Sequence, residues 1–190
     1  MKLYKKINLF IINRISKFYR PIMVSGFKTK DGKVLRNVRI SNTTFIDHPE
    51  SLAIGDYVFI GHFNFIEASN TISIGEGCQI TNYVSITTHS SHISIRLYGR
   101  QYINEKNHIG YVKGPIKIGK YCFIGPHSLI LPNTSIGNAC LIHPYSKVQG
   151  EFPDFSIIAG DPAKIIGNTK EMDKKYLDEH PILRKNNIFV

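Results

Sequence analysis

The stretch Ile118–Lys147 reads IGKYCF IGPHSL ILPNTS IGNACL IHPYSK and repeats with a period of six residues. Each hexapeptide opens with Ile, a Gly often follows, and the fifth place holds a small residue such as Cys, Ser or Thr. Six residues make one short strand and a turn, and three such units close a triangular coil. Successive coils stack at the spacing of paired strands, about 4.8 Å. The stretch therefore predicts an all-β solenoid, a parallel β-helix.

The same hexapeptide repeat occurs upstream, in IGDYVF IGHFNF IEASNT (54–71) and IGEGCQ ITNYVS ITTHSS (74–91). A degenerate copy of the repeat runs through Ile40 and Ile46. The opening Ile is expected to point inward and stack on the Ile of the next coil, while Gly permits the corner backbone. We expect about five coils over residues 40–167, interrupted by a loop over residues 89–115.

The three cysteines, Cys78, Cys122 and Cys140, occupy the small fifth place of their units. Their number is odd and their spacing contains no CxxC pair, which argues against a disulfide framework and against a zinc site. We expect reduced thiols in inward slots and no metal site.

The two flanking segments depart from the repeat. Residues 1–39 contain 11 Lys/Arg and one acid, whereas residues 40–190 contain 13 of each sign. Apolar residues at helical spacing predict an amphipathic helix over residues 3–20, which Pro21 ends. At the other end, residues 168–190 are expected to form a helix capped by Thr169 and closed by Pro181, followed by a tail.

The composition also bears on partners and location. The net charge of +10 lies in the N-terminal arm, so the neutral body argues against nucleic-acid binding. No transmembrane helix is expected, and a signal peptide is not expected because the apolar run is short and no cleavage site follows. We expect a cytoplasmic protein. Residues 2–20 carry six Lys/Arg and no acid, which indicates peripheral contact with the inner membrane face or packing of this helix on the oligomer.

Three stretches resemble one family: YVSITTH (83–89), GPIKIGKYCFIGPHSLILPNTSIG (114–137) and FSIIAGDPAKIIG (155–167). The chain resembles the hexapeptide-repeat, left-handed β-helix acetyltransferases, in the branch of saccharide O-acetyltransferases and xenobiotic acetyltransferases. The resemblance implies a left-handed coil, a homotrimer with active sites between subunits, and use of acetyl-CoA. It also implies that the loop interrupting the repeat covers the site and that the histidine at its start, His89, is the general base.

Further site residues follow from the same resemblance, which implies acceptor-binding residues at His62, Asn64 and Glu67. The loop residues His92, Arg96 and Tyr98 are candidates for binding the acceptor because of their place in the loop. Residues expected to contact acetyl-CoA are Phe123, Gly125, Ser128, Ser146, Gly160 and Lys164. Two departures are Gly150, where many relatives carry Lys, and Phe123, where relatives often carry Trp.

The chemistry agrees with this assignment. A sugar hydroxyl is a poor nucleophile at neutral pH and needs a base within hydrogen-bond reach as it attacks a thioester, and imidazole is tuned for this role. We therefore expect transfer of an acetyl group to a sugar hydroxyl in surface polysaccharide (capsule or lipopolysaccharide) biosynthesis.

The sequence is compatible with two other functions. The first is an N-acetyltransferase acting on an amino sugar nucleotide, and the second is a non-catalytic β-helix scaffold or membrane-surface binding module. A carbonic anhydrase of the β-helix type is not expected, since the histidines lack the required spacing for three zinc ligands. Aromatic residues at outward or corner positions favour burial in a trimer interface; they are Tyr57, Phe63, Phe65, Tyr83, Tyr121 and Phe123.

Overall fold

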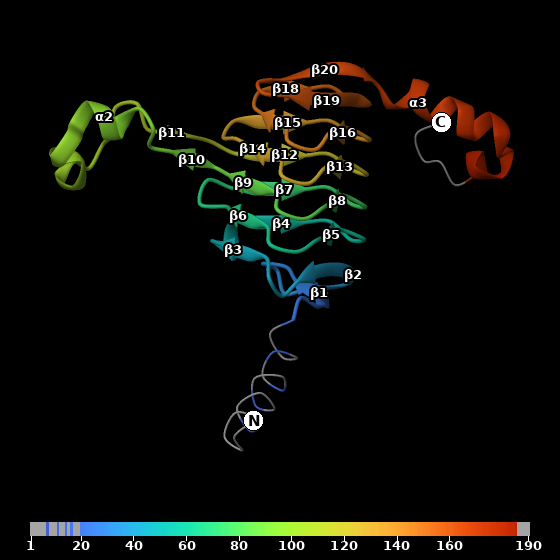
Figure 1. Ribbon diagram of the computed structural model, residues 1–190, viewed down its shortest axis with the longest axis horizontal. Helices are drawn as coiled ribbons and strands as arrows, with labels where there is room; N and C mark the ends of the chain where they lie inside the picture. The colour runs from blue at the N-terminus through green and yellow to red at the C-terminus, as the bar shows by residue number, and fades with distance from the viewer. Residues whose placement is uncertain (1–6, 8–10, 12–13, 15, 17–19, 186–190) are drawn as a thin grey trace.

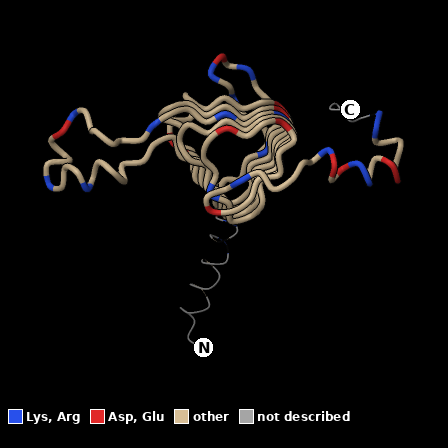
Figure 2. Tube along the Cα trace, turned by 90° about the horizontal axis from the view of Figure 1, so that it is seen from above, with Lys and Arg blue, Asp and Glu red and all other residues tan. Residues whose placement is uncertain are grey.

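The computed structural model describes residues 7, 11, 14, 16 and 20–185, and its body is a stack of coils (Figure 1). The chain passes through three parallel sheets in turn, so each coil places one short strand on each of three faces. Seen from above, the coils superpose as a rounded triangle (Figure 2). The predicted stacking of short strands in parallel sheets is confirmed.

The strands of each face are hydrogen-bonded in chain order. The first face holds β2 (Val34–Ser41), β5 (Phe59–Ile60), β8 (Gln79–Ile80), β13 (Phe123–Ile124), β16 (Leu141–Ile142) and β19 (Ser156–Gly160). The second face holds β3 (Phe45–Asp47), β6 (Phe65–Glu67), β9 (Ser85–Thr87), β14 (Leu129–Ile130) and β17 (Lys147–Val148). The third face holds β4 (Leu52–Ile54), β7 (Ile72–Ile74), β12 (Ile116–Ile118), β15 (Thr134–Ile136) and β18 (Glu151–Phe152). The short 3₁₀ helix η1 (Pro49–Ser51) joins β3 to β4.

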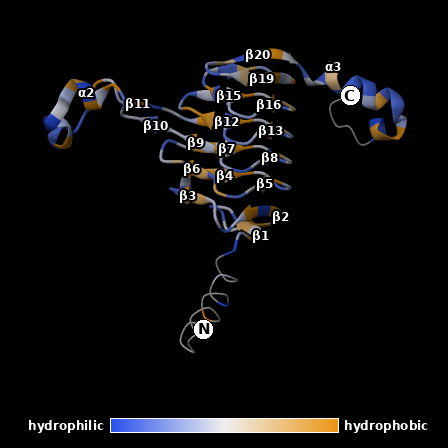
Figure 3. Cartoon of the chain, in the orientation of Figure 1, coloured by the Kyte–Doolittle hydropathy of each residue, from blue (hydrophilic) through white to orange (hydrophobic). Residues whose placement is uncertain are grey.

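The opening isoleucines of the hexapeptides form the core. On the first face, Ile60, Ile80, Ile124, Ile142 and Ile158 stand in register as one buried column. Figure 3 shows apolar colour on the strands of the coils, as the repeat requires. Burying such a side chain stabilises the fold by about 1.5–3 kcal/mol, so the column is a main source of stability.

The small fifth places also point inward, as predicted. Cys78, Cys122 and Cys140 are buried free thiols, one in each of three consecutive coils. Each thiol donates to a backbone carbonyl of the next coil, on Gly119, Gly137 and Pro153 respectively. The expectation of reduced, inward cysteines is confirmed.

Antiparallel strands cover both ends of the first face. At the start, β1 (Met23–Lys28) pairs with β2, and Leu35 and Val38 of β2 are buried, so the predicted boundary at residue 40 falls inside a strand. At the end, β20 (Ala163–Asn168) pairs with β19. Both hairpins cap the exposed edge of a solenoid, which otherwise presents unpaired backbone groups.

The C-terminal helix α3 (Thr169–Glu179) begins one residue earlier than the predicted cap suggested. The Asn168 side chain accepts a hydrogen bond from Lys170 N at 2.9 Å and is the N-cap. Thr169 is buried instead, and its hydroxyl donates to the Ala139 carbonyl at 2.8 Å, which attaches the helix to the last coils. The 3₁₀ helix η3 (Pro181–Lys185) follows.

The predicted N-terminal amphipathic helix lies outside the described residues except for five positions, of which Arg20 is a bend. Ile7, Ile11, Arg14 and Ser16 are helical and exposed. None of the helices in the described part of the chain has the length and apolar character needed to cross a bilayer.

Candidate active site

The solenoid opens at the corner between the second and third faces, after β9. There β10 (His89–Ser90) and β11 (Val112–Lys113) form an antiparallel ribbon that leaves the body. The ribbon carries α2 (Ser94–Tyr98) and η2 (Gly99–Asn104) on the opposite side of the body from α3 (Figure 1). Gly114 N donates to the Thr88 carbonyl at 3.0 Å, which closes the base of this excursion loop.

Glu67 is a buried carboxylate at this corner. It ends β6, one coil before β9, and its residue is paired with Thr87 in the parallel register. Its carboxylate accepts hydrogen bonds from Ser69 N at 2.7 Å, Thr88 N at 3.0 Å and Thr88 Oγ1 at 2.7 Å. Burial by itself raises the pKa of Glu67, but hydrogen bonds from Ser69 and Thr88 outweigh it and lower the pKa from 4.5 to about 2. The carboxylate is therefore ionised at neutral pH.

His89 is held by that carboxylate. Its Nδ1 lies 2.8 Å from Glu67 Oε2. An ionised carboxylate can only accept, so Nδ1 must donate the proton, and Nε2 of the neutral ring keeps a free lone pair. The His89 side chain is 37% exposed whereas that of Glu67 is 4% exposed. The pair therefore exposes Nε2 of His89 at the surface, while the buried Glu67 carboxylate holds the ring through Nδ1.

Tyr111, near the end of the excursion loop, completes the support of His89. Its ring stacks on the His89 ring with centroids 5.5 Å apart and planes 12° apart. Burial raises the pKa of Tyr111, so its phenol is neutral at working pH. The sequence alone does not point to Tyr111, because nothing in the repeat relates a tyrosine at the far end of the loop to a histidine at its start.

The predicted acceptor-binding residues separate into three groups. Glu67 is brought to His89, whereas His62 lies at the corner between the first and second faces, where its Nδ1 is 2.6 Å from Ser41 Oγ. Asn64 is buried, and its amide donates to the Thr81 carbonyl and accepts from Val84 N. We therefore assign Asn64 to the scaffold, because both of its polar atoms are used by the backbone of the next coil.

The remaining acceptor candidates lie inside the excursion loop. His92 Nδ1 is 2.8 Å from Ser90 Oγ, and the Arg96 guanidinium donates to the His92 carbonyl. Tyr98 Oη accepts from Ile109 N at 3.0 Å, so its hydroxyl helps to hold the loop together. These contacts shape the loop near His89 but do not reach the imidazole itself.

The predicted cofactor residues are also divided by the fold. Ser128 and Ser146 are buried, and both hydroxyls donate to the His143 carbonyl, at 3.0 and 2.8 Å. Both side chains therefore face the core, as the fifth place of each hexapeptide does, and their contact with acetyl-CoA stays a prediction. Gly125 packs so closely on the next coil that an added Cβ would stand 2.6 Å from Pro144 N. This close packing is sufficient to account for a glycine at this position.

Three predicted cofactor residues remain on the surface. Phe123 is exposed on the first face, and Gly160 lies in the hairpin between β19 and β20 with φ of 103°. Lys164 is exposed on β20, paired with Ala159 of β19. Phe123 lies one coil after the coil that carries His89 and on another face, whereas Gly160 and Lys164 lie on the last strands of the stack.

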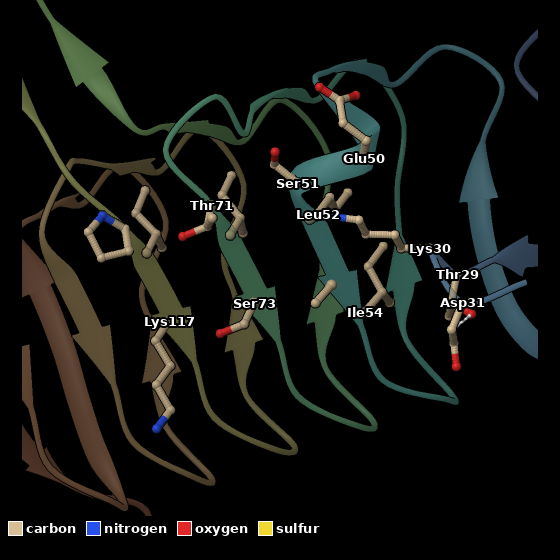
Figure 4. A pocket seen from close by; sticks show the side chains of 14 residues that line it. Thr29, Lys30, Asp31, Glu50, Ser51, Leu52, Ile54, Thr71, Ser73 and Lys117 are labelled. Carbon is tan, nitrogen blue, oxygen red and sulfur yellow. Dashed lines mark hydrogen bonds between the residues drawn. The ribbon is translucent and has the colours of Figure 1, made fainter. Parts of the chain in front are cut away.

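A groove of about 870 Å³ runs along the third face from the turn of the β1–β2 hairpin across β4 and β7 to β12 (Figure 4). Ser73 of β7 and Lys117 of β12 line it from neighbouring strands, and Thr71 lines it from just before β7. A second cleft of about 340 Å³ continues over β15 and β18 and shares Pro115 and Lys117 with the first. Pro115 closes the excursion loop, so both clefts meet beside the corner that carries His89.

Among the described residues, no group of three or more His, Cys, Asp or Glu side chains is arranged to hold a metal ion. The His89 corner presents a partly exposed imidazole that is supported by a buried carboxylate.

Comparison with known proteins agrees with the hexapeptide repeat. Residues 115–150 match the family described as "Bacterial transferase hexapeptide (six repeats)". Over 122 residues the chain is 32% identical to "Probable acetyltransferase Rv3034c" of Mycobacterium tuberculosis, covering 64% of this chain and 38% of that protein. Over 145 residues it is 28% identical to galactoside O-acetyltransferase of Escherichia coli, covering 72% and 66% respectively. The chain thus spans less than two thirds of either relative.

Solved structures share the fold. A maltose O-acetyltransferase from Clostridium difficile aligns with a TM-score of 0.57 at 23% identity, covering 67% of this chain and 64% of that one. An N-acyltransferase from Bacillus cereus, solved with dTDP and 3-hydroxybutyryl-CoA, aligns with a TM-score of 0.56 at 21% identity, covering 76% and 88%. The resemblance inferred from the hexapeptide stretches is confirmed.

Proposed function

We propose that this chain, which carries the hexapeptide repeat of bacterial transferases, moves an acetyl group from acetyl-CoA to a hydroxyl of a saccharide. The observation that carries the proposal is the Glu67–His89 pair at the corner where the solenoid opens. The relatives named as acetyltransferases, and the galactoside O-acetyltransferase in particular, support this choice of reaction and acceptor.

The reaction needs one base and no covalent intermediate. His89 Nε2 accepts the proton of the acceptor hydroxyl as that oxygen attacks the thioester carbonyl. The tetrahedral intermediate then collapses, the C–S bond breaks, and the imidazolium returns its proton to the departing thiolate. Glu67 stabilises the imidazolium through Nδ1 and keeps the ring in the tautomer that leaves Nε2 basic.

The two clefts on the third face support a reaction with two substrates. They meet at Pro115 and Lys117, beside the corner of His89. Two ligands that approach from opposite ends of this face would place their reacting groups near one base, which is what direct transfer in a ternary complex requires. Among the predicted contacts to acetyl-CoA, Phe123, Gly160 and Lys164 remain proposals.

Surface polysaccharide biosynthesis remains the proposed setting. The chain is 24% identical over 155 residues to an E. coli protein named for colanic acid biosynthesis, and 29% identical over 149 residues to one named for lipopolysaccharide biosynthesis. Transfer to the amine of a sugar nucleotide is the second candidate, and the likeness to the B. cereus N-acyltransferase favours it. The imidazole base serves either acceptor, because both must lose a proton on attack.

The left hand of the coil, the homotrimer, the cytoplasmic location and the membrane contact of residues 2–20 are proposals of the same kind. Exposed aromatic side chains on the described surface support the trimer, including Tyr57, Phe63 and Tyr83 at 47–61% exposure. Sedimentation of the full chain tests the trimer, and flotation with anionic vesicles, with and without residues 1–23, tests the membrane contact.

The experiment that tests the function is an acetyl-CoA turnover assay. The full-length protein is incubated with acetyl-CoA and a panel of saccharides, amino sugar nucleotides and polysaccharide fragments, and products are identified by their mass. Acetylation of a hydroxyl supports the main proposal, and acetylation only of an amine selects the second candidate. Absence of any acetylated product, with a folded protein, overturns both.

A further inference from the structure

We propose that a cavity in the excursion loop, lined by Tyr111 and Lys113 beside His89, binds a negatively charged group of the acceptor. The substrate would then be a phosphorylated or carboxylated saccharide. The inference rests on the proposed function and adds the substrate class. It is carried by the position of Lys113 relative to His89 and by the residues that line the neighbouring cavity.

Lys113 lies directly across from His89. In the antiparallel ribbon, the Cα partner of His89 is Lys113. Residues opposite each other on two antiparallel strands project to the same face, with Cβ atoms about 4.5–5.5 Å apart. Tyr111, two residues before Lys113, stacks on the His89 ring and therefore shows that this face of the ribbon is the one that carries the imidazole. Lys113 and the base His89 are therefore directly opposite each other on the two strands and project to the same face of the ribbon.

A cavity of about 410 Å³ opens on the same part of the loop. Two ammonium groups, an imidazole, a carboxamide and a phenol contribute to its wall, and none of the lining residues is acidic. The lining residues are Lys106, Asn107, His108, Ile109, Tyr111 and Lys113. His108 Nε2 lies 2.8 Å from the Tyr102 carbonyl, and its ring stacks on Tyr102 at 4.0 Å, so this imidazole is fixed in the wall. Donors without acceptor carboxylates favour an anionic ligand.

The positive charge of the loop is not neutralised within it. Residues 91–114 contain four Lys/Arg and one acid, Glu105, and Figure 2 shows basic positions along the loop. Glu105 accepts from Lys106 N and Asn107 N, so its carboxylate caps a turn. Among the described residues, no ion pair involves Lys106 or Lys113, whereas Lys120 and Lys147 on the coils pair with Glu76 and Asp161.

The phosphates of acetyl-CoA do not account for this cleft. In the proposed reaction the thioester carbonyl lies at His89, and the full length of the pantetheine arm separates it from the nucleotide phosphates. The Lys113 ammonium, which lies across the ribbon from His89, is therefore on the side of the acceptor. An anionic group held there would place a nearby hydroxyl against Nε2, which is the positioning that transfer requires.

The test compares matched acceptors and matched variants. The probes are glucose, galactose and N-acetylglucosamine 1-phosphates, the corresponding methyl glycosides, and glucuronate against glucose. The variants are Lys113→Met and Lys113→Arg, with Lys174→Met as the control that removes one charge from α3, on the other side of the body. Both kcat/KM for transfer and direct binding by calorimetry are measured for each.

We expect at least one anionic probe to be preferred over its neutral partner. Lys113→Met should lower kcat/KM for that probe by about 10–100-fold, as for loss of one charge-assisted hydrogen bond, and Lys113→Arg should restore most of it. The neutral probes, the KM for acetyl-CoA and the Lys174→Met variant should change less than about twofold. The comparison of sugar 1-phosphates with methyl glycosides tests a phosphate, and the comparison of glucuronate with glucose tests a carboxylate.

Two outcomes overturn the inference while leaving the proposed function intact: neutral acceptors that are used as well as anionic ones, or a loss in Lys113→Met that falls equally on both. A rise in the KM for acetyl-CoA in Lys113→Met also overturns it, since the cation would then serve the other substrate. Binding of an anionic probe that depends on Lys113, without transfer to any probe, would instead reject the acetyltransferase and retain the cleft.

Discussion

Two corners of the solenoid carry a histidine at the fourth place of a hexapeptide, and their roles differ completely. His127, in IGPHSL, lies at the corner between the first and second faces, where the backbone takes φ of 59° and the ring stacks between Tyr83 and Tyr145 at 4.9 Å from each. His89, in ITTHSS, lies where the chain leaves the coil, and its ring contacts Glu67 and Tyr111.

The difference teaches that the place in the repeat does not decide what a histidine does. At the closed corner, four successive coils each supply a ring, and Phe63, Tyr83, His127 and Tyr145 form one ladder. At the open corner the ribbon interrupts the stack, so the imidazole turns to a buried carboxylate one coil away. The proposed active site lies at the corner where the ladder does not form.

The largest expected effect is loss of turnover on changing the histidine of the open corner. His89→Ala should lower turnover by roughly 10²–10⁴-fold, the usual contribution of a positioned general base. Folding, oligomeric state and acetyl-CoA binding should persist, because the side chain is partly exposed and outside the core. Steady-state kinetics and calorimetry provide the measurement.

The matched control is the closed corner. His127→Ala should leave turnover within a few-fold, and His92→Ala should cost less than His89→Ala. Near-normal turnover in His89→Ala, with activity abolished in His92→Ala, would mean that the base has been misassigned and that the comparison of corners fails.

A change in the column that both corners share should affect stability and not chemistry. Ile124→Ala removes a fully buried side chain in register with Ile80 and Ile142. We expect the free energy of unfolding to fall by about 2–5 kcal/mol. Denaturant unfolding measures this, and kcat of the folded variant should remain near that of the wild type. A loss of kcat without a loss of stability would show that the open corner depends on the coil in a way that the contacts do not indicate.

Glu67→Gln tests the buried charge that distinguishes the open corner. The pKa of Glu67 is lowered from 4.5 to about 2, so the carboxylate stabilises the fold fully above pH 4.5 and loses this contribution as pH falls toward 2. The shift corresponds to about 3 kcal/mol. Unfolding curves of both proteins between pH 3 and 7 should therefore show the wild-type advantage shrinking with acid. Curves that stay parallel would mean that Glu67 is not held as an ionised group.

The smallest effect is expected for the ladder of the closed corner. His127→Ala removes two ring stacks and should lower the free energy of unfolding by about 1–2 kcal/mol. His127→Gly removes the same stacks but tolerates the positive φ, so it should cost no more than His127→Ala despite the loss of Cβ. Thermal unfolding of the two variants separates the stacking contribution from the backbone contribution.

The repeat by itself determined most of the fold. A hexapeptide period with inward isoleucines leaves few arrangements of the backbone, and it placed Ile124, Cys122 and the excursion after His89 correctly. The same rule, applied strictly, would have assigned Ser128 and Ser146 to the core, where they lie. Their expected contact with acetyl-CoA came from position along the family motif, which does not record the direction of a side chain.

Only the tertiary structure decided how His89 is supported. Glu67 lies 22 residues before it and reaches it because β6 and β9 stack in parallel register. Tyr111 stacks on it, and Lys113 lies across from it in the strand register, because the ribbon returns antiparallel to its own start. These placements depend on how many residues separate two passes of the chain over one corner. A period of six specifies each coil, but the register of a loop that breaks the period is set by packing alone.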